Sequence, residues 1–188
     1  MDITFQFEPE KAIQAMAYIL HQLASVEKVK LTKLLYIADR EHFLEEGYPI
    51  TGDRQFAMKW GPVPSGCLEL LDDEADTNGL FEYFQIVNNT LFLRHLTAFD
   101  KLGESERRVL DHVIAEHGSK YRWDLVEETH HFPEYRDVYV KGTSTFIPYE
   151  LMLKHYGNEN QFMFGRPVIS EKMSKHMLCP FPTREPDL

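Results

Sequence analysis

The sequence has little of what cross-linking by disulfides or metals requires. Its 188 residues include two cysteines, Cys67 and Cys179, which lie far apart and form no repeated pattern. Zinc sites and secreted disulfide frameworks need several cysteines at short, regular spacings, so the sequence fits neither. A chain of this length buries about 70% of the surface that its unfolded form exposes, enough to hold a core without such cross-links. We therefore expect no cofactor, and the cysteine usage favours a reducing cytoplasm.

Long apolar runs and a basic surplus are also missing. No window approaches the ~20 apolar residues of a membrane-spanning helix, and the N-terminus lacks the basic stretch and apolar segment of a signal peptide. The 30 Asp and Glu residues outnumber the 20 Lys and Arg residues, which gives a net charge of -10. Phosphate binding draws on a surplus of cations, so the composition argues against nucleic acid and favours a basic protein partner. The sequence predicts a soluble, cytoplasmic protein without membrane contact.

Apolar residues recur at three-and-four spacing in several stretches, a pattern that predicts amphipathic helices. Pro64 is tolerable in the first turn of one of them, where its missing N–H is harmless. The first two helices are expected to form a helical hairpin. The predicted helices cover residues 10–24, 29–46, a short stretch from Pro64, 105–118, 122–131 and 147–156.

Signals for strands are fewer. Apolar residues alternate over 55–60, which favours a short strand that Gly61-Pro62 ends. The apolar segments 84–87 and 90–93 flank Asn88-Asn89, a pair that tolerates the positive φ angles of a tight hairpin turn. The expected fold class is therefore mainly α with a small antiparallel β element (α+β), a single-domain helical bundle with a β-hairpin.

The periodic signal fades near the C-terminus. Residues 1–157 are expected to form the domain, and residues 158–188 a C-terminal extension that contains four prolines. This extension either wraps over the domain's own core or makes a contact specific to a partner. Its candidate contact residues are Phe162, Phe164, Met173, Met177 and Phe181.

Nine histidines invite an enzymatic interpretation. Adjacent histidines on a helix point about 100° apart, and no His-Glu-x-x-His sequence is present. Asp39 and His42 share a helix face, but no nucleophile or oxyanion loop accompanies them, and no glycine-rich phosphate loop occurs. We expect no catalytic set and no metal site. The alternative, a metal-dependent hydrolase, would use neighbouring carboxylates with the histidine cluster His112, His117 and His130.

The two helices predicted over 105–118 and 122–131 have the spacing of a helix-turn-helix. The second helix carries Asp124, Glu127 and Glu128 with Arg122 as its base-contact candidate, so it would bring negative charge into a DNA groove. The same spacing serves plain helical packing. An operon-autoregulating DNA-binding protein and an adaptor to a protease stay open as further alternatives.

The sequence Trp60-Gly61-Pro62 is the most distinctive local motif. Glycine gives conformational freedom and proline locks φ, which together imply a fixed bend. Trp60 is expected either to fill the core at this bend or to anchor a partner in a recognition groove.

Several segments together resemble the Panacea domain, also called the SocA-like antitoxin domain. Their order and spacing agree with the family over about residues 10–157, which is most of the chain. One departure is Tyr135, which stands where the pattern often has a tryptophan. The segments are Leu31-Thr32-Lys33-Leu34-Leu35-Tyr36-Ile37-Ala38, Gly47-Tyr48-Pro49-Ile50, Phe56-Ala57-Met58-Lys59-Trp60-Gly61-Pro62-Val63 and Leu125-Val126-Glu127-Glu128-Thr129-His130.

The resemblance implies a mostly helical domain with a small β element. It implies the antitoxin of a bacterial or phage-borne toxin–antitoxin system, a non-enzymatic protein that binds and neutralises a cognate toxin encoded nearby. The structural motif carries over onto Lys33, Gly61 and Pro62. The predicted toxin-binding residues are Tyr36, Asp39, Trp60, Trp123 and His130.

Two hypotheses accompany this interpretation. Substitution of Tyr36 or Asp39 should release the toxin and leave the fold intact, whereas Trp60→Ala should mainly destabilise. The charge of -10 would steer the chain to a basic toxin and let it occupy a nucleotide or nucleic-acid site there. The sequence leaves open the toxin's identity, the oligomeric state and the mode of neutralisation.

Overall fold

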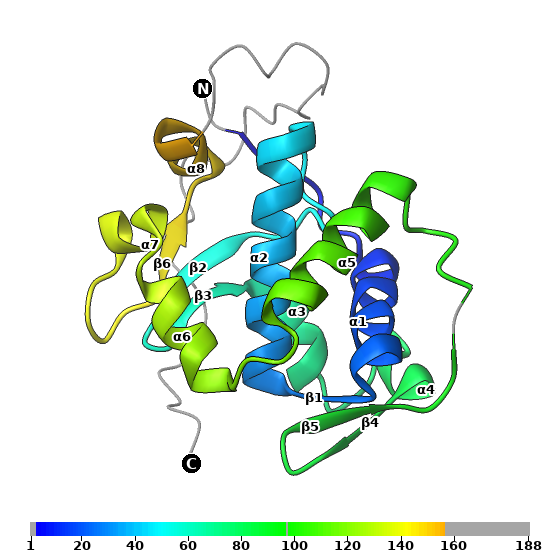
Figure 1. Cartoon of the computed structure of the whole chain (residues 1–188). Helices are drawn as coiled ribbons and strands as arrows, with labels where there is room; N and C mark the ends of the chain where they lie inside the picture. The colour runs from blue at the N-terminus through cyan, green and yellow to red at the C-terminus, as the bar shows by residue number, and fades with distance from the viewer. Residues whose placement is uncertain (1–2, 97, 157–188) are drawn as a thin grey trace.

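Helices dominate the fold. The computed structural model describes residues 3–96 and 98–156, which form eight helices and two antiparallel three-stranded sheets (Figure 1). This confirms the prediction of a mainly α fold with a small antiparallel β element. The helices are α1 (Pro9–Leu23), α2 (Lys28–Glu46), α3 (Ser65–Asp72), α4 (Leu80–Tyr83), α5 (Glu104–His117), α6 (Arg122–His130), α7 (Pro133–Val138) and α8 (Tyr149–Tyr156).

Helix α2 runs through the middle of the molecule, with α1 and α5 on one side and α6 on the other (Figure 1). Most of its side chains are buried, including those of Lys33, Asp39 and Arg40. The predicted stop is confirmed, because Gly47 follows the helix at φ +85°, a left-handed conformation that glycine adopts without strain. α2 is thus a central helix enclosed by other elements.

The first sheet has the strand order β1-β5-β4, with β1 (Ser25–Glu27), β4 (Phe84–Val87) and β5 (Thr90–Leu93). The predicted hairpin is confirmed. Asn88 and Asn89 form its turn with φ angles of 49° and 60°, as a type I′ turn requires. Strand β1, which has three residues and pairs with β5, was not predicted from the sequence.

The second sheet has the order β3-β2-β6, with β2 (Gln55–Met58), β3 (Gly61–Pro64) and β6 (Thr145–Ile147). The prediction that the strand over 55–60 ends the β structure at Gly61-Pro62 is wrong. These two residues begin a second strand, β3, which pairs with β2 after a tight turn. Proline is tolerated there because β3 is an edge strand, where a ladder N–H is dispensable. Pro64 ends β3 and precedes α3, so it is not in the first turn of that helix.

Prolines lie at or next to the starts of the last two helices. Helix α6 ends at His130, before Pro133, and Pro133 opens α7 at the first helical position, which proline favours. The last helix begins at Tyr149 rather than residue 147, because Ile147 belongs to β6.

The predicted extension, residues 158–188, lies outside the described residues. None of the helices within the described ranges is long and apolar enough to cross a membrane.

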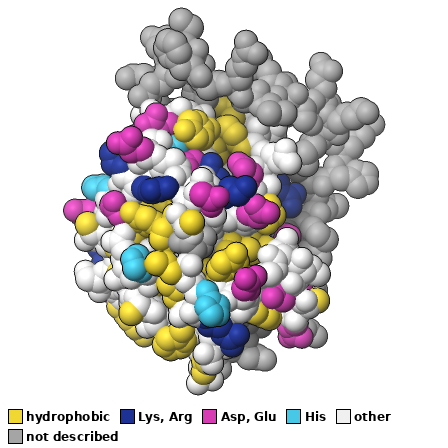
Figure 2. Space-filling view, turned by 90° about the vertical axis from the view of Figure 1, so that its right-hand side faces the viewer, with side chains coloured by type: hydrophobic (Ala, Val, Ile, Leu, Met, Phe, Trp, Pro, Cys, Tyr) yellow, Lys and Arg dark blue, Asp and Glu magenta, His cyan; other side chains and the backbone are white. Residues whose placement is uncertain are grey.

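The surface over α1 and α5 carries charges of both signs. Figure 2 shows acidic and basic side chains crowded together there, with hydrophobic side chains between and below them. On α5, Arg108 forms ion pairs with Glu45 (2.9 Å) and Glu46 (3.2 Å) at the end of α2. All three are partly or largely exposed, so these pairs contribute little to stability.

Candidate partner-binding site

Three of the four segments that resemble the family meet at one corner of the fold, where the β2–β3 turn approaches α2 and α6. Lys33 Nζ donates a hydrogen bond of 2.7 Å to the Pro62 carbonyl. Gly61 has a φ of +89°, and a Cβ there would lie 2.6 Å from Thr129 Oγ1. Both the backbone and the available space therefore require glycine. We call the following set the tryptophan corner: Lys33, Trp60, Gly61, Pro62, Trp123, Thr129, His130 and Tyr135.

Tyr135 fixes the turn from the far side of the corner. Its hydroxyl donates to the Met58 carbonyl at 3.0 Å, and the Gly61 backbone also forms a hydrogen bond with it. Its ring stacks on His130 with centroids 5.0 Å apart and an interplanar angle of 10°. Burial raises the pKa of Tyr135, so its hydroxyl stays protonated. Sequence reasoning missed this role because the two bonded residues lie far apart in the chain.

The two tryptophans form the accessible part of the corner. The rings of Trp60 and Trp123 meet edge to face with centroids 5.5 Å apart, and both side chains are half-buried. Lys59 Nζ lies 5.5 Å from the Trp60 ring, and Arg122 Cζ lies 5.1 Å from the Trp123 ring. Next to them, Tyr121 is 55% exposed. The surface therefore presents aromatic rings beside cations, a combination common in protein interfaces.

His130, another residue of the corner, is half-buried. Burial, with the nearby charge of Lys33, lowers the pKa of His130, so the ring is neutral at pH 7. Its Nε2 atom is buried and has no hydrogen-bond partner among the residues that the structure describes. The ring acts as a packing surface between Gly61 and Tyr135 rather than as a charged group.

Tyr36 lies in the core, although it was predicted to face a toxin. Its side chain has no exposed surface, and its hydroxyl donates to Glu134 Oε1 at 3.1 Å. Arg40 Nε donates to the same oxygen at 2.5 Å, and its guanidinium lies 4.4 Å from the Phe132 ring. A partner cannot touch Tyr36 in this conformation; the residue ties α2 to α7.

Asp39 is buried on another side of α2. Its carboxylate accepts hydrogen bonds from the Thr51 N–H at 2.8 Å, the Thr51 hydroxyl at 2.5 Å and Gln55 Nε2 at 3.2 Å. Burial raises the pKa of Asp39 to about 7, against the opposing effect of these bonds. Nearby, Asp53 accepts the N–H groups of Gly66 and Cys67, both at 2.7 Å. These buried carboxylates position the loop before β2 and the start of α3.

The histidines proposed for the hydrolase alternative do not converge. His112 lies 4.0 Å from Glu41, whereas His117 lies 3.4 Å from Glu128 and His130 stacks on Tyr135. Over residues 3–96 and 98–156, no group of three His, Cys, Asp or Glu side chains could hold a metal ion.

The helix pair considered for DNA binding is α5 and α6. Both helices pack against α2. The DNA-contact candidate Arg122 forms an ion pair with Glu27, and its guanidinium lies over the Trp123 ring. Arg122 is therefore engaged by residues of this protein, and these contacts compete with a role in binding DNA.

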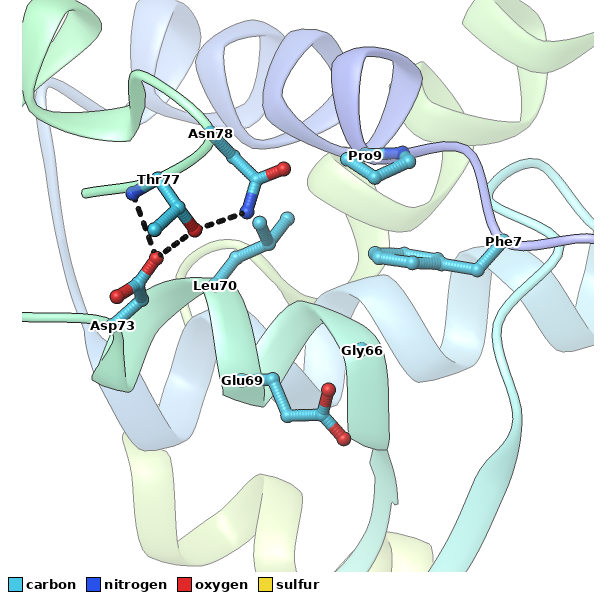
Figure 3. Close-up of a pocket in the computed structure, with 8 residues that line it drawn as sticks. All are labelled: Phe7, Pro9, Gly66, Glu69, Leu70, Asp73, Thr77 and Asn78. Atoms are coloured by element: carbon cyan, nitrogen blue, oxygen red, sulfur yellow. Dashed lines mark hydrogen bonds between the residues drawn. The ribbon is translucent and has the colours of Figure 1, made fainter. Parts of the chain in front are cut away.

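An open hollow of about 380 Å³ lies on another part of the surface, between the N-terminal segment and α3 (Figure 3). Its lining combines Phe7 and Leu70 with the carboxylates Glu69 and Asp73, and Asp73 accepts hydrogen bonds from Thr77. The hydrogen bond between the Thr77 hydroxyl and the Asp73 carboxylate is exposed. The hydrogen bonds from Thr77 lower the pKa of Asp73, which makes it a poor general base, so the lining does not resemble an active site.

The fold and the corner define a mainly helical domain with its distinctive residues gathered around a half-exposed aromatic pair. The chain belongs to the family of the antitoxin SocA-like, Panacea domain, whose model matches residues 31–135, more than half of the sequence. The match confirms the resemblance seen in the sequence, and it spans the whole tryptophan corner. No curated protein and no solved structure matches the chain significantly.

Proposed function

We propose that this chain is the antitoxin of a toxin–antitoxin system and that it neutralises a cognate toxin, encoded nearby, by direct binding without catalysis. The observation that carries the proposal is the family match over residues 31–135, which includes every residue of the tryptophan corner. Antitoxin action requires a protein interface, and the corner offers the aromatic and cationic side chains that dominate binding energy in such interfaces.

The toxin contacts are assigned to the half-exposed residues of the corner. Trp60 and Trp123 supply large, rigid rings at low entropic cost, with Lys59 and Arg122 at their margins. His130 stacks on Tyr135 and lies beside Gly61, the residue that follows Trp60. Tyr36 and Asp39 act indirectly in this proposal, because their buried contacts hold α2 against α7 and the loop before β2.

The net charge of the chain favours a toxin that is a basic protein. At -10, the antitoxin attracts cationic proteins over a distance set by the ionic strength. We therefore expect the association rate with the toxin to fall severalfold as salt rises from low to physiological concentration. An association rate insensitive to salt would contradict this part of the proposal.

The direct test is to express the neighbouring open reading frame alone and together with this chain, and to measure growth and co-purification. We expect toxicity of the neighbour alone, rescue by the chain and a stable complex. A harmless neighbour that forms no complex would refute the antitoxin proposal.

The corner is tested by Trp123→Ala, with Tyr48→Ala as the matched control. Tyr48 is an aromatic residue that follows α2 with 39% exposure, and its ring packs on His42. Loss of a central aromatic anchor costs about 2 kcal/mol or more, so Trp123→Ala should weaken toxin binding at least ~30-fold. Tyr48→Ala should leave affinity unchanged. If a folded Trp123→Ala variant binds as tightly as the parent, the toxin uses another face.

A further inference from the structure

Strand β4 leaves an open edge on the first sheet. The sheet ends with β4, and its hairpin with β5 lies at the bottom of Figure 1. Val87 and Thr90 flank the two-residue turn, so they form a hydrogen-bonded pair, and alternation along the ladder makes Gln85 and Phe92 the next such pair. The N–H and C=O of Ile86 therefore point away from β5. Among the described segments, none pairs with this edge.

The edge is also uncharged. Residues 83–93 contain no Asp, Glu, Lys or Arg in a chain of which 27% of residues are charged. Exposed edges are usually protected by lysine, proline or a bulge, and β4 has no proline or lysine. Val87 and Phe92 are 43% and 41% exposed, and the register places both on the outer face of the sheet.

A hollow follows the same strand. It has a volume of about 320 Å³ and is lined by residues of α4, β4 and the segment after β5. Phe84 and Ile86 contribute apolar surface, and Arg94 contributes a cation. Backbone groups, exposed apolar side chains and a hollow thus coincide along one strand.

We propose that this edge is a self-association surface at which β4 pairs in antiparallel orientation with β4 of a second copy. A two-fold axis would place Ile86 opposite Ile86 of the second copy, with two reciprocal hydrogen bonds between them, and Val87 opposite Gln85. The two three-stranded sheets would then form one sheet of six strands.

Charge favours a second copy as the occupant. Two molecules of charge -10 repel each other, so self-association requires a contact free of like charges. The uncharged residues 83–93 meet this requirement. In an antiparallel pair of identical strands, each strand also offers the N–H and C=O groups that the other needs. Because a strand of four residues buries less than the ~800 Å² per partner of a standard interface, the dimer should be weak and concentration-dependent.

Sedimentation equilibrium of the full chain without toxin tests the proposal. The apparent mass should rise from 22.1 kDa toward twice that value between low micromolar and millimolar concentration. Hydrogen exchange should show a matching change at one position. The Ile86 amide should gain protection as concentration rises, while the Gln85 and Val87 amides, bonded to β5, stay protected throughout.

The test variant is Val87→Lys, and the matched control is Val140→Lys, since Val140 is 58% exposed and lies outside the first sheet. Val87→Lys places two new cations near the axis and should raise the dimer dissociation constant at least tenfold. Val140→Lys should leave it unchanged.

Several results would overturn the proposal. One is a monomer at every concentration, and another is an equal effect of the two lysine variants. Protection of the Ile86 amide in the monomer would show that another segment of this chain covers the edge. If the parent chain is a monomer and Val87→Lys still abolishes toxin binding, the edge belongs to a toxin strand instead. Since sedimentation omits the toxin, its outcome is independent of whether the antitoxin proposal holds.

Discussion

Replacement of Gly61 by alanine probes the geometry of the tryptophan corner. Gly61 has a φ of +89°, and an alanine in that region costs about 1–2 kcal/mol. Its Cβ would also lie 2.6 Å from Thr129 Oγ1 and 3.3 Å from Lys33 Cε, both in a packed environment. Overpacking of this kind costs a further ~1–3 kcal/mol. We therefore expect Gly61→Ala to lower the free energy of unfolding by ~2–5 kcal/mol.

Gly142→Ala separates the two contributions. Gly142 has a similar φ of +82°, but a Cβ there meets nothing within 4 Å. This control should lose only the backbone contribution of about 1–2 kcal/mol. Thr129→Ala in the Gly61→Ala background removes the hydroxyl that obstructs the new Cβ and should recover part of the loss.

Urea denaturation followed by tryptophan fluorescence is the appropriate assay, because Trp60 and Trp123 are the two tryptophans of the chain and both belong to the corner. Circular dichroism at helical wavelengths provides the global unfolding curve. If Gly61→Ala and Gly142→Ala differ by less than about 0.5 kcal/mol, the steric argument for the corner is wrong.

Three further variants test the buried polar groups. Tyr36→Phe removes the hydroxyl that donates to Glu134 and should cost about 0.5–1.5 kcal/mol of stability with unchanged toxin affinity; reduced affinity at unchanged stability would restore Tyr36 as a contact residue. With the pKa of Asp39 raised to about 7, the folded state retains a proton that the unfolded state releases near pH ~4. Stability should therefore fall from pH ~4 to ~7, and Asp39→Asn should flatten this decline in urea titrations. Burial lowers the pKa of Lys33 to about 7, so the unfolded state binds the extra proton and stability should rise from pH ~7 to ~10. Lys33→Met should lack that rise, although it also loses the hydrogen bond to Pro62.

Local signals predicted a large part of the fold. The three-and-four spacing predicted a helix over 29–46, and α2 covers Lys28–Glu46. The pair Asn88-Asn89 predicted the β4–β5 hairpin because its turn depends on the two residues themselves. Both features rest on contacts between residues close in sequence, where periodicity and turn chemistry act directly.

The missed elements depend on distant partners. β1 and β6 are strands of three residues that exist through pairing with β5 and β2, which lie far away in the chain. No period can be recognised over three residues. The β2–β3 turn was missed for another reason, because Gly61-Pro62 signals a bend equally well at the end of a strand and between two strands.

The candidate site shows the same division. The motif residues Lys33, Trp60 and His130 were found in the sequence, and the structure brings them to one corner. Tyr36 and Asp39 were predicted to bind the toxin directly. Instead α2 is enclosed on most sides, and partners from other segments satisfy its polar groups.

These buried contacts separate the structural residues of the domain from those available for recognition. Lys33 bonds to β3, Asp39 to the loop before β2 and Arg40 to α7, so three positions of one helix fix three other segments. Removal of either partner from such a buried pair leaves a polar group without a hydrogen bond and lowers the stability of the fold. Substitutions at these positions are therefore poorly tolerated. The half-exposed Trp60 and Trp123 are less constrained by burial. We infer that a substitution at either tryptophan can change partner affinity while the helix beneath keeps the corner in place.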